Sequence, residues 1–356
     1  MMNTNSKNET AKKSKKAICI TGMHRSGTSA VACAISLLGV YFGKPNDMMT
    51  PLPENPMGFW ERADLVSLHD KIYHRLKRQW DTVIPLPKQW HRLAKMRVTW
   101  LELLNFVKRE FIDHPLWGWK DPRTALLLDV WKDLLNDLGV ELFCLLVVRS
   151  PLDVALSLSR RDGFSYEKSF GIWLNYYISA LNSSTDIPKT FISYDNLVDN
   201  CESTIKRCAK KLEIQWPEED TELKKELKQF ILPKLNHSNA ANDLRNSISI
   251  PKPAVKLYEL LECASRTDKS PDEAFYNDID IIAQDFFSYS SPFRENIDQL
   301  WDCKKHLHEQ KKRIETIERQ LNALAISENQ FKRFDYKFTA LYNSIKKMEQ
   351  LIKQRR

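Results

Sequence analysis

Residues 22–29 read GMHRSGTS and place two glycines, a guanidinium and three hydroxyls in one short segment. The spacing is that of a phosphate-binding loop, G-x-x-x-x-G-K-[ST], except that Thr28 occupies the lysine position. Backbone N–H groups of a glycine-rich turn at a helix N-terminus bind an anion without a lysine. We therefore predict that this segment, the anion loop, binds an anion through His24, Arg25, Ser26, Gly27, Thr28 and Ser29. The alternative is a Gly-Ser turn without function.

A second group of polar residues lies in RSPLDVALS, residues 149–157. Arg149 ends the apolar run LFCLLVV, and Ser157 follows eight residues later in a helix that Pro151 is suited to begin. In an open parallel sheet, ligands bind at the carboxyl ends of the strands. Arg149 and Ser157 are therefore expected to form a second anion site beside the anion loop. Two adjoining sites imply a ligand with two separated phosphate-type groups.

HRSGTS followed by VVRSPLDVALS resembles the sulfotransferases that use 3′-phosphoadenosine 5′-phosphosulfate. The resemblance covers about residues 17–215, with YDNLVDN (194–200) and KLEI (211–214) as further matches. It implies a P-loop-type three-layer α/β/α fold. It also implies that the anion loop holds the 5′-phosphosulfate and the second anion site the 3′-phosphate, with adenosine 3′,5′-bisphosphate as the product.

The chain is more similar to the carbohydrate- and tyrosine-sulfating branches, and to bacterial relatives with GMHRSGTS, than to the soluble small-molecule branch. That branch has an Arg-Lys-Gly stretch near its end that also binds the cofactor, and this chain has none. Arg245, in NDLRNS, is the candidate for the missing contact. The lysine-free loop further implies a metal-independent enzyme.

Transfer of a sulfuryl group to a hydroxyl requires a base for the acceptor proton and a cation for the leaving oxygen. Glu61, in NPMGFWER, is the first candidate for the base and roughly matches the position of a catalytic Glu in the tyrosine-sulfating branch. His69 is its rival, with His24 a further alternative. A non-catalytic Glu61 would be an acid favoured at a helix start.

Lys120, in WKDPR, is the candidate for the leaving-group cation, because this stretch resembles the Lys-Asp-Pro of the tyrosine-sulfating branch. Pro122 restricts Asp121 to an extended conformation, which would place Lys120 at the end of a strand. Arg123 is a candidate to assist it. The alternative is a surface Lys–Asp pair.

Six aromatic residues near these motifs favour a carbohydrate acceptor, because aromatic faces stack on sugars. They are Phe59, Trp60, Trp80, Trp90, Trp117 and Trp119. Packing in the core is the alternative, and it is the better expectation for most of them.

The apolar runs at 17–21, 117–120, 142–148 and 190–194 predict strands, and the segments between them have helical patterns. The alternation predicts an α/β fold with a parallel sheet. The expected organisation is a disordered basic tail (1–16), a sulfotransferase domain (17–295) and a C-terminal helix (296–356). Within the domain, 17–215 forms the cofactor-binding core and 216–295 is helical.

Residues 301–356 contain neither glycine nor proline and carry apolar residues at alternating spacings of three and four. The repeat changes phase near Glu328, a pattern that predicts a coiled coil with a short interruption. We expect a projecting helix that self-associates or binds a protein partner. A helix that packs on its own domain is the alternative.

The 356 residues are 42% hydrophobic and 28% charged, as expected for a soluble globular protein. The net charge of +8 is spread along the chain without a nucleic-acid motif, so we expect an anionic cofactor and no nucleic acid. The lack of a long apolar run predicts no membrane span. Seven scattered cysteines and no visible secretory signal indicate reduced thiols and a cytoplasmic protein. Two alternatives remain: a P-loop kinase, and a catalytically silent nucleotide-binding scaffold that acts through its C-terminal coil.

Overall fold

The computed structural model describes residues 15–51, 58–217, 221–230, 248–267, 270–290, 294–323 and 328–354. Arg245, the candidate for an additional cofactor contact, lies outside these ranges. Contacts within the chain divide it into two units, Met1–Tyr289 and Ser290–Arg356. Among the helices of the described ranges, none is both long enough and apolar enough to cross a membrane.

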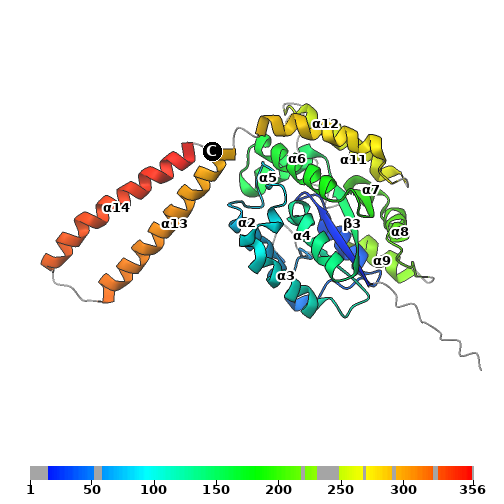
Figure 1. Ribbon diagram of the computed structural model, residues 1–356, viewed down its shortest axis with the longest axis horizontal. Helices are drawn as coiled ribbons and strands as arrows, with labels where there is room; N and C mark the ends of the chain where they lie inside the picture. Colours follow the sequence, from blue (N-terminus) through cyan, green and yellow to red (C-terminus); the bar gives the residue numbers. More distant parts are fainter. Residues whose placement is uncertain are drawn as a thin grey trace, which may run out of the picture. The chain divides into compact units, whose positions relative to one another are not determined.

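The first unit contains a parallel sheet of four strands (Figure 1). They are β1 (Lys15–Gly22), β2 (Leu116–Lys120), β3 (Val140–Val148) and β4 (Lys189–Ser193), in the order β2-β1-β3-β4. The apolar runs thus form the predicted strands, and their continuous hydrophobicity fits a sheet that is covered on both faces. The α/β prediction is confirmed. β1 begins at Lys15, inside the segment predicted to be a disordered tail.

Alternate residues of the strands enter two separate apolar cores. Ala17 and Cys19 of β1 pack on one face of the sheet, and Ile18 and Ile20 pack on the other. The first face is covered by α2 (Ala63–Arg75), α3 (Arg97–Glu110), α4 (Thr124–Asp137), α5 (Pro151–Asp162), α6 (Tyr166–Ser183), α11 (Lys252–Arg266) and α12 (Glu273–Ser290). The second face is covered by α1 (Thr28–Ser36), α7 (Tyr194–Asp199), α8 (Cys201–Lys211) and α9 (Thr221–Phe230).

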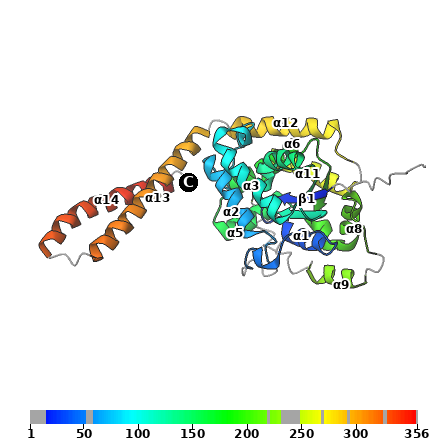
Figure 2. The ribbon, with the colours of Figure 1, turned by 60° about the horizontal axis from the view of Figure 1, so that its bottom comes forward.

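Figure 2 shows the resulting three layers, with α1, α8 and α9 on one side of β1 and α6, α11 and α12 on the other. The predicted three-layer arrangement is therefore confirmed. One helix predicted at 197–212 is instead the pair α7 and α8, because Asn200 between them has a non-helical backbone (φ −136°). Three short 3₁₀ turns, at Pro45–Asp47, Trp90–Arg92 and Ala94–Met96, complete the segments between α1 and α3.

The second unit consists of α13 (Arg294–Ala323) and α14 (Glu328–Gln354). Lys311 Nζ of α13 lies 2.5 Å from Glu349 Oε1 of α14, so the two helices run back along each other as an antiparallel pair. Ile345, in the apolar repeat of α14, is only 5% exposed. The predicted long helix is therefore two helices, and the second begins at Glu328, where the apolar repeat changes phase.

Candidate active site

The anion loop follows β1, at the point where the sheet order diverges. β1 lies between β2 and β3 in the sheet, so the next strand in the sequence, β2, pairs with one edge of β1, and β3 pairs with its other edge. This is the position at which open α/β sheets bind their ligands. The loop ends at Thr28, the first residue of α1, so the predicted strand–loop–helix context is present.

Two glycines allow the loop to lie close to its neighbours. Gly22 has φ +145°, and a Cβ at this position would lie 2.4 Å from the carbonyl oxygen of Val147. Gly27 has φ +86°, and its Cβ would lie 2.3 Å from the ring of Tyr194. A side chain at either position would be strained by the backbone and would collide with these atoms.

The N-terminus of α1 carries no acidic residue in its first turn, and its N-cap residue Gly27 provides no side-chain cap. Ser26 N donates to Met23 O at 3.2 Å and closes the turn of the loop. Ser26 Oγ lies 3.3 Å from Tyr177 Oη, which in turn donates to Val147 O at 2.7 Å. The loop is thus fixed to β3, with the positive end of a helix dipole at its rim.

The side chain of Arg25 reaches the second anion site. Its backbone has φ +69°, and its Nε donates to Ser157 Oγ at 2.9 Å. Arg149 Nη1 donates to the carbonyl oxygen of Arg25 at 2.8 Å. The structure therefore brings Arg25, Arg149 and Ser157 together, whereas the motif predicts Arg25 at the 5′-phosphosulfate.

Arg149 is held from two sides where β3 ends. Trp173 Nε1 donates to the carbonyl oxygen of Arg149 at 3.1 Å. The guanidinium carbon of Arg149 lies 4.4 Å from the centre of the Tyr194 ring. Its Nε is buried and has no hydrogen-bond partner in the described part of the chain. A buried guanidinium N–H without an acceptor is costly, so this atom is suited to receive an anionic oxygen.

Lys120 lies at the end of β2, where its pairing with Ile20 of β1 places it beside the anion loop. Its side chain is 3% exposed, and its Nζ is 2.5 Å from Glu61 Oε1. The same ammonium donates to Phe59 O at 2.9 Å and to Ser29 Oγ at 3.2 Å. Lys120, Glu61 and the first turn of α1 therefore form one cluster.

Arg123 provides a second cation for Glu61, with 3.3 Å between Nη1 and Oε2. It also contacts Asp121 through Nη1 at 3.1 Å and Asp70 through Nε at 3.0 Å. Burial acts to raise the pKa of Asp121, but Arg123 and His69 outweigh it and hold this pKa well below its usual range. Asp121 is therefore an anion that positions Arg123, a role that the sequence analysis did not assign.

His69 is fully buried, and both of its ring nitrogens have partners. Nδ1 lies 2.7 Å from Asp121 Oδ2, and Trp131 Nε1 donates to Nε2 at 3.0 Å. Because an indole N–H can only donate, Nε2 is the acceptor and Nδ1 carries the proton. In this arrangement no ring nitrogen of His69 is left to receive a proton from an acceptor.

His24 is 8% exposed and lies in the anion loop with its ring 4.5 Å from that of Trp80. Its Nε2 is buried without a hydrogen-bond partner among the described residues. Burial, with added repulsion from Arg123 and Arg161, holds the pKa of His24 well below its usual range. Its imidazole is therefore neutral at neutral pH.

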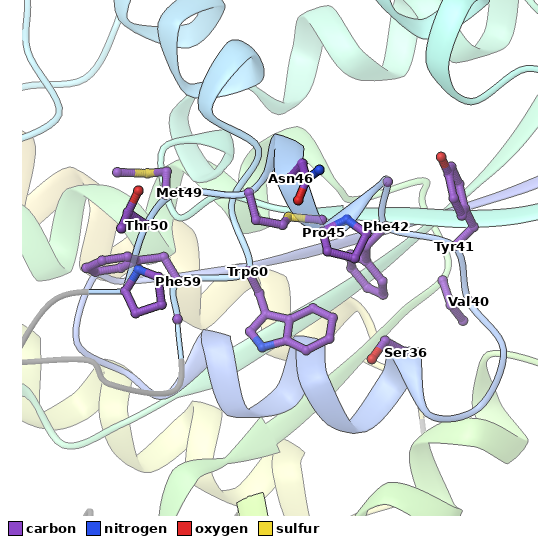
Figure 3. A pocket seen from close by; sticks show the side chains of 14 residues that line it. Ser36, Val40, Tyr41, Phe42, Pro45, Asn46, Met49, Thr50, Phe59 and Trp60 are labelled. Atoms are coloured by element: carbon purple, nitrogen blue, oxygen red, sulfur yellow. The ribbon is translucent and has the colours of Figure 1, made fainter.

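A cavity of about 620 Å³ lies beside α1 (Figure 3). Phe59 and Trp60, which directly precede Glu61, form part of its wall. Figure 3 shows the Trp60 indole between α1 and the segment that carries Phe42 and Pro45. Phe59 thus links the cavity to the Lys120–Glu61 cluster, because its carbonyl oxygen accepts from Lys120 Nζ at 2.9 Å.

Most of the aromatic residues that suggested a sugar acceptor lie elsewhere. Trp90, Trp117 and Trp119 are at most 2% exposed and belong to the core. Trp80 stacks on Phe164 and contacts the His24 ring in a tilted arrangement. Only the pair at 59 and 60, out of the six, lines the cavity.

No protein-family model matches the chain, and no curated protein matches it. Among solved structures, a sulfotransferase domain from the Synechococcus PCC 7002 olefin synthase is 14% identical, covers 77% of this chain and 95% of its own, and has a TM-score of 0.38. The sulfotransferase domain from the curacin biosynthetic pathway is 11% identical, with coverages of 76% and 97% and a TM-score of 0.35.

Sulfotransferase STF1 from Mycobacterium tuberculosis is 14% identical, with coverages of 61% and 71% and a TM-score of 0.34. These are similarities of backbone arrangement. The chemistry of the site follows from the residues and distances described above.

Proposed function

We propose that this protein is a sulfotransferase that transfers SO₃ from 3′-phosphoadenosine 5′-phosphosulfate to a hydroxyl acceptor. The observation that carries the proposal is the contact of Lys120 with both Glu61 (2.5 Å) and Ser29 (3.2 Å). It places a cation and a carboxylate together at the edge of the anion loop. These are the two groups that sulfuryl transfer to a hydroxyl requires.

The two phosphate-type groups of the donor match the two anion sites. The N–H groups of the anion loop and the hydroxyls of Ser26, Thr28 and Ser29 would hold the 5′-phosphosulfate. The 3′-phosphate, a dianion, would lie at Arg149 and Ser157, with Arg25 as a second guanidinium. The unpartnered Nε of Arg149 would donate to it.

In the reaction, the acceptor oxygen attacks the sulfur as Glu61 removes its proton. The bond between sulfur and the phosphate oxygen breaks in line with the new bond, and adenosine 3′,5′-bisphosphate leaves. Lys120 donates to the leaving oxygen and stabilises the charge that develops there. Arg123, held by Asp121, orients the Glu61 carboxylate. The transferred SO₃ carries less charge than a phosphoryl group, and the proposed step uses no metal.

The position of the main cation distinguishes this site from that of a P-loop kinase. In a kinase of that class the loop lysine neutralises the β- and γ-phosphates, whereas here Thr28 takes its place and Lys120 comes from β2. The sequence predicts a saccharide as the acceptor. Of the six aromatic residues on which that prediction rests, only Phe59 and Trp60 line the cavity.

The proposal is tested by incubating the full chain with sulfate-labelled donor and a panel of sugars, apolar alcohols, phenols and tyrosine peptides. We expect label on at least one hydroxyl compound and release of adenosine 3′,5′-bisphosphate. Calorimetric binding of Mg-ATP, with phosphoryl transfer from it, would instead identify a kinase. Tight donor binding without transfer to any acceptor would identify a silent scaffold.

A further inference from the structure

We infer that the cavity beside α1 binds the uncharged, apolar body of the acceptor, so that the substrate is a phenol or alcohol with a hydrophobic skeleton. This inference rests on the proposed function and names the substrate class of the same site. Its volume of about 620 Å³ lies in the range of roughly 300–1,000 Å³ that is usual for small-molecule sites.

The lining of the cavity carries no charged side chain among the described residues. Most of the wall is aliphatic, aromatic or thioether, and it includes Val40, Phe42, Met48, Met49, Phe59 and Trp60. The polar side chains of the wall are those of Ser36, Tyr41, Asn46 and Thr50, and the Ser36 hydroxyl already donates to Cys33 O at 2.7 Å. The wall therefore offers few partners for a ligand with many hydroxyls.

This lining discriminates between the two acceptor classes. A saccharide would leave several hydroxyls without partners in the cavity, and each buried unsatisfied polar group costs about 1–3 kcal/mol. An apolar skeleton has no polar groups to leave unsatisfied, and the burial of its surface favours binding. The Trp60 indole, in T-shaped contact with Phe42 (centroids 6.2 Å apart), offers a surface on which such a skeleton can pack.

The cavity wall also leads to the reacting groups. The carbonyl oxygen of Phe59 accepts hydrogen bonds from both Lys120 Nζ and Ser29 Oγ, at 2.9 and 3.0 Å. Trp60 has φ +55°, a left-handed turn from which the chain proceeds directly to Glu61. Glu61 and Lys120 do not line the cavity themselves, so the acceptor hydroxyl would reach them past Phe59, the wall residue that Lys120 contacts.

The inference is tested by titrating the full chain, saturated with adenosine 3′,5′-bisphosphate, with 2-naphthol and with glucose in a calorimeter. We expect 2-naphthol to bind and glucose not to bind. Met49→Glu places a carboxylate in the wall of the cavity, at a half-buried position. It should lower the affinity for 2-naphthol at least about tenfold. Met49→Leu should retain binding. Met348→Glu, the same change on α14, is the matched control and should bind 2-naphthol as the unmodified protein does.

No binding of 2-naphthol, or equal binding by Met49→Glu and the unmodified chain, would overturn the inference. So would binding of glucose that Met49→Glu abolishes. Sulfate transfer to a sugar without 2-naphthol binding would leave the proposed function intact and overturn only the acceptor class. Cavity-dependent binding of 2-naphthol without sulfate transfer to any acceptor would instead contradict the proposed function.

Discussion

Arg25 Nε donates to Ser157 Oγ at 2.9 Å, across 132 residues of sequence. The contact joins the anion loop to α5 and adds a guanidinium to the predicted second anion site of Arg149 and Ser157. Arg149 completes the cluster by donating to the carbonyl oxygen of Arg25. Two cations and a hydroxyl at one point match the double charge of a phosphate monoester.

Arg25→Ala should therefore weaken the binding of adenosine 3′,5′-bisphosphate more than the binding of adenosine 5′-phosphate. Hydrogen bonds to charged groups contribute about 1.5–3 kcal/mol, which corresponds to a loss of roughly ten- to a hundredfold. Calorimetric titration of both nucleotides gives the comparison. Arg160→Ala, an exposed arginine on the same helix as Ser157, is the control. Equal losses for the two nucleotides would place Arg25 at the first phosphate group instead.

Glu61→Gln should lower the rate of sulfate transfer by about 10²–10⁴, because an amide cannot take the acceptor proton. The affinity for adenosine 3′,5′-bisphosphate should persist, since the anion loop and Arg149 are unchanged. The rate of labelled sulfate transfer and calorimetry measure the two quantities. Glu102→Gln, at a half-buried position of α3, controls for the substitution. Turnover close to that of the unmodified enzyme would exclude Glu61 as the base.

Lys120→Met should reduce both turnover and stability. It leaves the Glu61 carboxylate, only 6% exposed, with fewer partners, and breaking a buried ion pair costs about 3–5 kcal/mol. The double variant Lys120→Met/Glu61→Gln removes the uncompensated charge and should be more stable than the sum of the two single effects predicts. Urea unfolding of all four proteins measures the coupling. Strict additivity would mean that the pair is not coupled.

The stability of the protein should fall as the pH drops below about 6.5, through His24. Its pKa in the folded state lies well below the ordinary value of 6.5, mainly because of burial. Between the two values the unfolded chain binds more protons than the folded one, so acid favours unfolding, by at most about 1.4 kcal/mol per pH unit. Above the ordinary value the imidazole is neutral in both states and contributes no slope.

His24→Asn should remove this part of the pH dependence. The measurement is the free energy of unfolding in urea at about pH 5.5 and about pH 7.5, taken for both proteins. The difference between the two pH values should be smaller for the variant. An identical difference would show that His24 titrates normally in the folded protein.

Among the residues of the α13–α14 apolar repeat whose burial is described, most are half-buried and Ile345 is buried. We therefore expect self-association through residues 301–356, because a second copy would cover the remaining apolar surface. Sedimentation of the full chain at micromolar concentration should give an oligomer, and removal of these residues should give a monomer. A monomer in both cases would contradict self-association.

Much of the fold could be predicted from local patterns. The four apolar runs form strands because each is short, continuous and bounded by turn residues, and the alternation with helices requires a parallel sheet. GMHRSGTS marks the loop after β1, since its glycines occupy positions where a Cβ would collide with Val147 and Tyr194. The sequence likewise identified Arg149, Ser157, Lys120 and Glu61 as candidates, although their roles remain predictions.

Which candidates meet was decided only by the tertiary structure. Nothing in the spacing of residues shows that Arg25 bends toward Ser157, that both nitrogens of His69 are engaged, or that Lys120 contacts Glu61. The C-terminal repeat predicted helices, but only the tertiary structure shows, for example in the Lys311–Glu349 pair, that they fold back on each other. Local patterns follow from the preferences of neighbouring residues, whereas burial and partnership depend on segments far apart in the chain, which the sheet brings together.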